Sequence, residues 1–169
     1  MPIVLSNLTL PEGLTFVGET YTAPPGQAQY TTPGTYSWTA PASVTSVSVV
    51  CIGGGGSGGS SGGSNGPGGG GGGGGGVAYK NNIAVTPSVS YTVIVGAGGT
   101  TLGTTSTRYS GGLSSFTNSV ITVTAGGGQG ALRYPGSPSY ATGGAPSGTY
   151  DGGGTGGQGN TGGPDNGDD

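Results

Sequence analysis

Residues 53–76 read GGGGSGGSSGGSNGPGGGGGGGGG, with glycine at eighteen of the twenty-four positions. Glycine has no Cβ and populates much of φ/ψ space, so a run of this kind can be a linker that is costly to order. It can also form extended helices with three residues per turn, which pack closely and hydrogen-bond sideways to one another. The segments on either side of the run distinguish these two interpretations.

A strand-like stretch runs directly into glycine three times along the chain. The three junctions read VVCIGGGG (49–56), VIVGAGG (93–99) and TVTAGGG (122–128). If the returning strands pair antiparallel with their neighbours, all three glycine excursions leave the same end of a single sheet. Lateral hydrogen bonding requires such a side-by-side arrangement, so the repeat favours an ordered glycine layer over a linker.

The rest of the pattern predicts a fold made of strands. In residues 43–52, Val47, Val49 and Cys51 share one face while Ser46 and Ser48 share the other, as in a half-buried strand. Trp38 is expected in the core. Similar stretches predict strands at 35–39, 89–95, 113–117 and 120–124, and a strand or strand pair at 77–85 around Asn81-Asn82. We therefore expect an all-β fold: a small β-sandwich-like sheet whose glycine-rich excursions pack as a polyglycine-II-type layer.

Composition excludes several classes of function. The net charge is −3 with three Lys and Arg residues, too few to neutralise the phosphates of a nucleic acid. Histidine is absent and Cys51 is the one cysteine, so neither a zinc site nor a disulfide framework is expected. G-x-G-x-x-G matches occur in any polyglycine and indicate nothing here. We expect no catalytic, cofactor-binding or metal-binding residues, and hence no enzyme.

The N-terminal residues 1–29 form a zone of different composition. They are apolar and interrupted by prolines, which makes a long helix improbable. We predict an extended anchoring arm; the alternative is a strand or two that completes the core of the domain. The absence of a basic, apolar leader indicates synthesis in the cytoplasm without export, and no stretch is long enough for membrane insertion. The anchoring residues would be Ile3, Val4, Leu5, Leu8, Leu10, Leu14 and Phe16.

Residues 30–163 are expected to form the glycine-rich β domain, followed by an acidic end at 164–169. The mostly glycine stretch 152–163 could add strands to the same layer. Ordering twenty-four residues of backbone costs about 30–40 kcal/mol, whereas a backbone hydrogen bond returns only about 1 kcal/mol net. A glycine layer alone should thus be marginal, which favours a homo-oligomer, such as a trimer, or attachment to a larger assembly.

The order of motifs resembles the glycine-rich domain of bacteriophage virion and tail-fibre proteins. The shared pattern is YTTPGTYSWTAPASVTSVSVV (30–50) followed by polyglycine, then Ala78-Tyr79-Lys80, Val85-Thr86-Pro87 and YTVIVGAGG (91–99). The resemblance covers about residues 30–163. It implies a virion surface component, and some phage adhesins of related composition pack polyglycine helices into a sandwich. It implies no catalytic residues.

These inferences lead us to expect a structural virion protein of a bacteriophage that is anchored by its arm and projects the glycine-rich domain for host attachment. Its partners would be other capsid or tail proteins, and a host surface glycan or outer-membrane protein. The candidate receptor-contact residues are Tyr134, Tyr140 and Tyr150, because exposed aromatic residues often make such contacts. The alternative is a capsid decoration or head-fibre protein that stabilises or decorates the shell.

Overall fold

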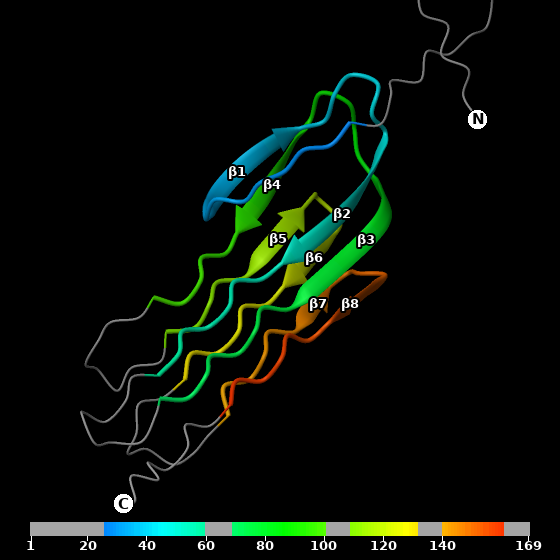
Figure 1. Cartoon of the computed structure of the whole chain (residues 1–169). Coiled ribbons are helices and arrows are strands. Elements are labelled where there is room, and N and C mark those ends of the chain that lie inside the picture. Colours follow the sequence, from blue (N-terminus) through cyan, green and yellow to red (C-terminus); the bar gives the residue numbers. More distant parts are fainter. Residues whose placement is uncertain (1–25, 60–68, 101–108, 132–139, 161–169) are drawn as a thin grey trace, which may run out of the picture.

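The stretches of alternating and β-branched residues form eight strands. A computed structural model describes residues 26–59, 69–100, 109–131 and 140–160, and within these ranges it contains strands and no helix (Figure 1). The anchoring arm expected at 1–29 lies outside the described residues except for its last four positions. The strands are β1 Gly34–Thr39, β2 Ser46–Ile52, β3 Val77–Ala84, β4 Ser90–Val95, β5 Ser114–Thr117, β6 Thr122–Ala125, β7 Pro146–Gly148 and β8 Gly152–Gly154.

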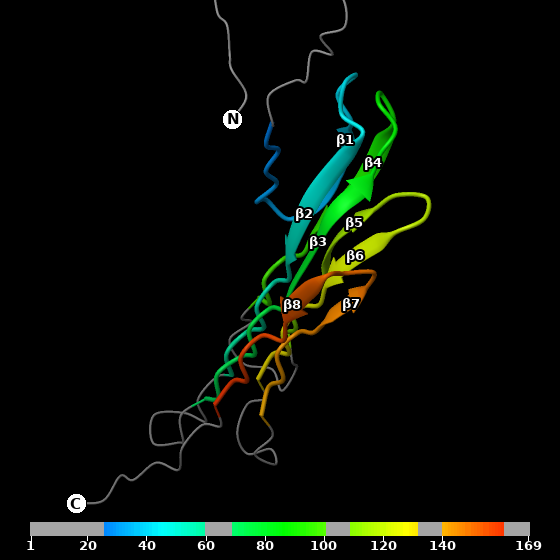
Figure 2. The ribbon, with the colours of Figure 1, turned by 90° about the vertical axis from the view of Figure 1, so that its right-hand side faces the viewer.

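Two antiparallel sheets pack face to face. One has the strand order β1-β4-β5-β6-β7 and the other the order β2-β3-β8 (Figure 2). This architecture confirms the predicted all-β, sandwich-like fold. The expectation that all three strand-to-glycine junctions belong to one sheet is wrong, because β2 lies in the three-stranded sheet and β4 and β6 lie in the five-stranded one. β2 pairs with β3 rather than with β4. The strand of the first junction therefore lies across the core from the strands of the other two junctions, β4 and β6.

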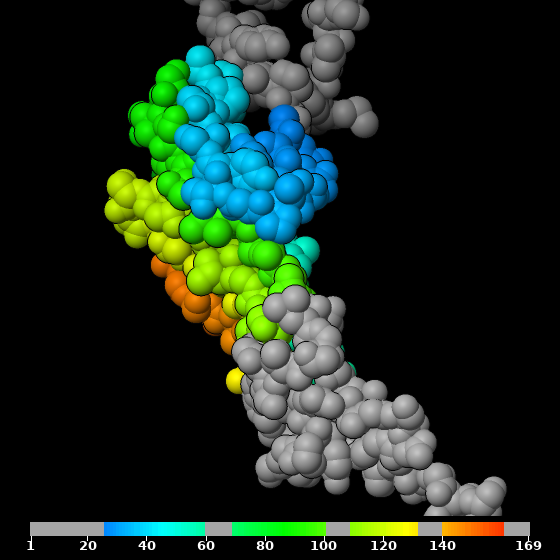
Figure 3. Space-filling model, turned by 90° about the vertical axis from the view of Figure 1, so that its left-hand side faces the viewer, coloured from blue at the N-terminus to red at the C-terminus, as the bar shows by residue number. Residues whose placement is uncertain are grey.

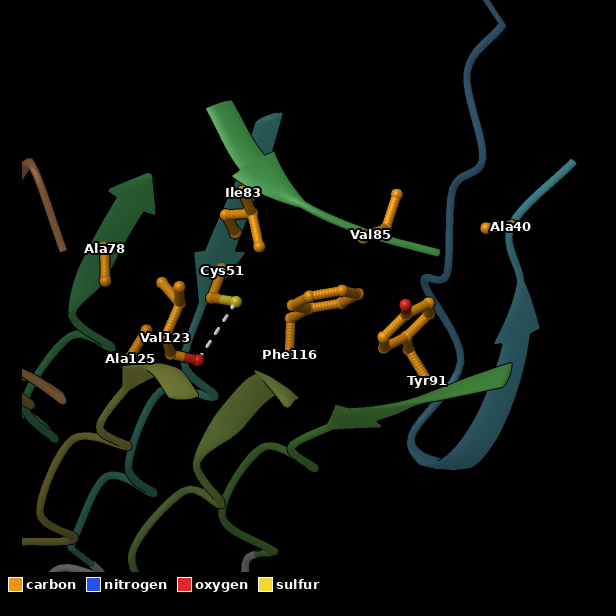
Figure 4. Packing of buried hydrophobic residues seen from close by; sticks show 9 residues of the cluster. All are labelled: Ala40, Cys51, Ala78, Ile83, Val85, Tyr91, Phe116, Val123 and Ala125. Carbon is orange, nitrogen blue, oxygen red and sulfur yellow. Dashed lines mark hydrogen bonds between the residues drawn. The ribbon is translucent and has the colours of Figure 1, made fainter. Parts of the chain in front are cut away.

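The core lies between the sheets and is small. Ile83 of β3 and Val123 of β6 are its largest fully buried side chains. An aromatic group extends the core toward β1 and β4, where the rings of Tyr91 and Phe116 stack with centroids 5.9 Å apart (Figure 4). Trp38 packs against both rings as a partly buried residue, at 5.9 Å and 6.3 Å, as expected.

Local backbone features decide between two alternatives and explain one turn. Of the strand or strand pair predicted at 77–85, the single strand is found, and Asn82 is accommodated within it at a φ of 53° near an irregularity in the β2–β3 register. Asn tolerates this left-handed conformation better than most residues. At the β5–β6 turn, the Asn118 side chain accepts hydrogen bonds from the backbone N–H groups of Val120 and Ile121.

All glycine-rich segments leave the same end of the sandwich, as the repeat predicts. Residues 53–59 follow β2, residues 96–100 follow β4 and residues 126–131 follow β6, and they run side by side (Figure 1). The described chain starts near the opposite end and runs back along β1, whose first residue, Gly34, pairs with Val95 at the bundle end of β4 (Figure 1). The ring of Tyr30 contacts that of Tyr36 at a centroid distance of 5.0 Å. Figure 3 shows these first described residues, in blue, lying against the part of the sandwich formed by β1 and β4.

Candidate functional site

The glycine-rich part is an ordered bundle held together by backbone hydrogen bonds. The bonds recur at every third residue: Gly53, Gly56 and Gly59 donate to the carbonyls of Gly76, Gly73 and Gly70 at 2.8–2.9 Å. This repeat of three is that of polyproline-II-type helices. The glycine layer predicted from the sequence therefore includes residues 53–59 and 69–76, which are the described parts of the 53–76 run. Seven segments take part: 53–59, 69–76, 96–100, 109–113, 126–131, 140–145 and 155–160.

The hydrogen-bond partners arrange these segments in two rows. Residues 53–59 bond to four segments, for example through Gly54 N–H to the Gly112 carbonyl and Gly99 N–H to the Gly55 carbonyl. Residues 69–76 also bond to four. The pairings define a four-segment row, in the order 96–100, 53–59, 69–76 and 155–160, that packs on a three-segment row of 109–113, 126–131 and 140–145. The predicted addition of the stretch after residue 152 to the layer is confirmed for residues 155–160.

Close approach between neighbouring backbones explains the glycines of the bundle. A Cβ built on Gly75 would lie 1.8 Å from the carbonyl oxygen of Gly53, and one on Gly73 would lie 2.1 Å from that of Thr142. No side chain fits at such distances, because the atoms opposite are backbone. Glycine is therefore needed here for packing, as the sequence indicated.

The segments at the two ends of the four-segment row need fewer glycines. In residues 155–160, a Cβ would clash at Gly156 and Gly159, at 2.1 Å and 1.8 Å, whereas Gly157 has nothing within 4 Å. In residues 96–100, Gly96 and Gly99 are the positions of clash. In a segment at an end of the row, which has neighbours on one side, glycine is therefore required at every third residue. In a segment between two others, glycine is required more often.

The end of the bundle away from the sandwich is where the chain repeatedly enters and leaves it. The described chain breaks off after Gly59, Thr100 and Ala131 and resumes at residues 69, 109 and 140. Each of these positions is distal, since the other end of every segment joins a strand (Figure 1). The bundle is thus a stem whose tip is formed by these described ends of its segments.

The structure separates the tyrosines that the sequence singled out. Tyr140 is 59% exposed and lies at the tip, immediately before Ala141, whose carbonyl accepts a hydrogen bond from Gly159. Tyr150 is 43% exposed but lies between β7 and β8, beside the sandwich. Tyr134 lies outside the described residues, as do the seven apolar residues assigned to the arm: Ile3, Val4, Leu5, Leu8, Leu10, Leu14 and Phe16.

One ion pair fastens β8 to β3. Lys80 Nζ donates to Asp151 Oδ1 at 2.8 Å, and the backbone N–H of Asn81 donates to Asp151 Oδ2 at 2.7 Å. The hydrogen bond from Lys80, followed by that from Asn81, lowers the pKa of the Asp151 carboxyl. Sequence reasoning missed this link, because its partners are 71 residues apart and no local pattern connects them.

Cys51 is a buried residue of the core. Its thiol donates weakly to the carbonyl of Val123 at 3.6 Å, and burial raises the pKa of the thiol. Within the described ranges, no three His, Cys, Asp or Glu residues gather as a metal site would require. The same part of the chain has no helix of sufficient length and apolarity to cross a membrane.

A surface feature formed by four exposed apolar side chains was also not predicted from the sequence. Val50 and Ile52 of β2, and Val77 and Tyr79 of β3, point away from the core and are 37–66% exposed. A signal for two of them existed in the sequence. The register that buries Val47, Val49 and Cys51 necessarily places Val50 and Ile52 on the face of Ser46 and Ser48.

Comparison with protein families identifies the family of the chain. The model of a family described as a glycine-rich domain matches residues 31–169, which is most of the chain. No curated protein matches it.

Proposed function

This chain belongs to the glycine-rich domain family. We propose that it is a structural surface protein of a bacteriophage virion. The N-terminal arm anchors it to the particle, and the glycine bundle projects for host attachment. The support from the sequence is the ordered set of motifs over residues 30–99 that resembles the glycine-rich domain of phage virion and tail-fibre proteins.

The observation that carries the proposal is the separation of the two ends of the molecule. The described chain begins near the sandwich end, whereas residues 53–59, 96–100 and 126–131 run from the sandwich to the opposite tip of the bundle (Figure 1). Backbone hydrogen bonds between many segments hold the bundle as a stem, which keeps its tip at a fixed distance from the sandwich. This is the arrangement that a projecting attachment domain requires, with contact residues carried on a rigid scaffold.

At the tip, the proposal assigns receptor contact to Tyr140 among the described candidates. An exposed tyrosine offers an apolar ring and a hydroxyl to a glycan or a protein surface. Tyr150 lies beside the sandwich and serves as a matched control. The Tyr140→Ala variant should weaken binding of the purified protein to host cells by about ten-fold, which corresponds to about 1.4 kcal/mol, and Tyr150→Ala should not. Equal effects of the two variants would contradict contact through the tip.

Location on the particle tests the function itself. Antibodies raised against the protein should label the tails of intact virions in electron micrographs, at few copies per particle. Labelling of the head at high copy number would support the alternative, a capsid decoration or head-fibre protein. A protein that labels no part of the particle, and whose loss leaves infection unchanged, would refute both versions of the proposal.

A further inference from the structure

The part of the outer face of the three-stranded sheet that lies nearest the glycine bundle is apolar and uncovered within the described structure. Val50 stands opposite Tyr79, and Ile52 opposite Val77, so the four side chains are neighbours on one face. Their exposed fractions are 66%, 40%, 64% and 37% in that order. Farther from the bundle this face carries Ser46 and Ser48. The outer face of the other sheet carries exposed hydroxyl residues such as Thr35, Ser37 and Thr92.

The same face continues onto the glycine bundle. Residues 53–59 extend β2 and residues 69–76 lead into β3, so the four-segment row lies in line with the three-stranded sheet (Figure 2). The other side of this row packs on the three-segment row. The outer sheet face and the outer side of the four-segment row therefore form one surface.

Backbone donors on this surface lack acceptors. In residues 53–59, the N–H groups of Gly53, Gly56 and Gly59 point to one neighbouring segment and those of Gly54 and Ser57 to another. The N–H groups of Gly55 and Gly58 have no backbone acceptor among the described residues. Because the helix has three residues per turn, this third set points in a third direction, away from both neighbours. Both residues are exposed, as expected for that direction.

The glycines at these positions are not required by packing inside one molecule. A Cβ on Gly55 or Gly58 would lie 3.8 Å or 3.6 Å from its nearest neighbour, which is ordinary van der Waals contact. At most other described glycines of the bundle a Cβ would lie within 3.4 Å of another backbone, although not at Gly98 or Gly157 in the two outermost segments of the four-segment row. The N–H groups of Gly55 and Gly58 have no backbone acceptor among the described residues. Inside the bundle, glycine N–H groups of the same kind bond to an adjacent segment.

We propose that this surface, formed by Val50, Ile52, Val77, Tyr79, Gly55 and Gly58 and here called the assembly face, binds the assembly face of a second copy of the chain. The four apolar side chains of one copy pack against those of the other, and Gly55 and Gly58 pack against the same glycines of the other copy. Polyglycine packing then continues across the boundary between the two molecules. The inference goes beyond the proposed function, because it concerns self-association and holds whether or not the protein attaches to a host.

A second copy fits this face better than a charged or bulky partner does. A partner that approaches Gly55 and Gly58 closely must itself lack side chains there, and this chain has such a surface. Charge does not oppose the contact, because Lys80 and Asp151 are the only charged residues in the described ranges and they neutralise each other. The face is about 29 Å long and 14 Å wide by strand and helix dimensions, about 400 Å². This is the size of a weak, concentration-dependent contact, half of the roughly 800 Å² per partner in a standard interface.

Sedimentation of the full chain at about 1 to 100 µM tests the proposal. The wild type should self-associate over this range. The double variant Val50→Glu/Ile52→Glu should weaken association at least ten-fold, because it places like charges opposite each other. So should Gly55→Gln/Gly58→Gln, whose side chains have room in the monomer but would hold two faces apart. The matched control Ser37→Glu/Thr92→Glu carries the same added charge on the other sheet.

Circular dichroism and urea denaturation at low concentration establish that each variant is folded. Association lost in both face variants and kept in the control would support the assembly face. A wild type that remains monomeric at 100 µM, or association that survives both face variants, would overturn it. A failure here leaves virion labelling unaffected, so the two proposals fail independently.

Discussion

Alanine substitution at two adjacent glycines should change stability in opposite directions. Gly156 and Gly157 lie in the same segment at the edge of the bundle. A Cβ at Gly156 would stand 2.1 Å from the carbonyl oxygen of Gly74, whereas a Cβ at Gly157 would meet nothing within 4 Å. Gly156→Ala and Gly157→Ala add the same atom to the same chain, so their difference isolates backbone packing.

The structure sets the size of the first effect. To admit a Cβ at residue 156, the segment must move away from residues 69–76, and Gly74 N–H then loses its 2.8 Å hydrogen bond to the Gly157 carbonyl. Overpacking costs about 1–3 kcal/mol and a lost backbone hydrogen bond about 1 kcal/mol. Gly156→Ala should therefore destabilise the protein by about 2–4 kcal/mol, a large part of the stability of a small domain.

The second effect arises in the unfolded state. Alanine has less backbone freedom than glycine, so a substitution that the native conformation accepts stabilises a protein by about 0.4–1 kcal/mol. Gly157 is not in the left-handed region and has open space around it. Gly157→Ala should thus be neutral or stabilising by up to about 1 kcal/mol.

Urea denaturation at low micromolar concentration, followed by the fluorescence of Trp38, measures both effects. Trp38 is partly buried and lies 5.9 Å from Tyr91, so it reports on loss of the sandwich. With a slope of about 1–3 kcal/mol per molar urea, the midpoints of the two variants should differ by at least about 0.7 M. Midpoints that shift together, or a midpoint for Gly156→Ala that equals that of the wild type, would refute the packing argument.

Three further predictions concern the sandwich. Asp151→Asn should lower stability at neutral pH. Because the folded pKa of Asp151 is depressed, the stability advantage of the wild type is present above the ordinary Asp pKa and should vanish as the pH falls through the folded pKa. A difference in urea midpoint that persists in acid would contradict this. Ile83→Ala removes a fully buried side chain and should cost about 2–5 kcal/mol in urea denaturation, whereas Val120→Ala, at an 86% exposed position, should change stability by less than about 0.5 kcal/mol; similar costs would show that the core is misplaced. The Cys51 thiol should react with a thiol reagent far more slowly in native than in unfolded protein, since it is buried and its pKa is raised; equal rates would contradict its place in the core.

The sequence predicted the strands that carry apolar alternation and the end from which the glycine segments leave. Val47, Val49 and Cys51 face inward as expected, and the strand predicted at 43–52 is found as β2 Ser46–Ile52. Alternation shows which side chains share a face of a strand, but it does not show which strand is the neighbour. For this reason the pairing of β2 with β3, and with it the second sheet, was not foreseen.

Two further features lay beyond sequence reasoning for a physical reason. β7 and β8 have three residues each and contain mostly small residues, so they show no hydrophobic period. The division of the bundle into two rows depends on contacts between segments far apart in the chain, and polyglycine has no side chains to encode a register. The row arrangement is reflected only in the spacing of glycines that packing requires and glycines that it does not, as at Gly156 and Gly157. This spacing can be interpreted only when the neighbouring segments are known.

Amide hydrogen exchange in the glycine bundle tests the central claim most directly. In residues 69–76, the N–H groups of Gly71, Gly73, Gly74 and Gly76 donate to neighbouring segments, and those of Gly72 and Gly75 have no backbone acceptor among the described residues. At a concentration where the protein is monomeric, the first four amides should exchange at least about ten-fold more slowly than in an unstructured chain, with faster exchange at Gly72 and Gly75. Exchange of all six amides at unstructured rates would contradict the ordered, backbone-bonded bundle on which this account rests.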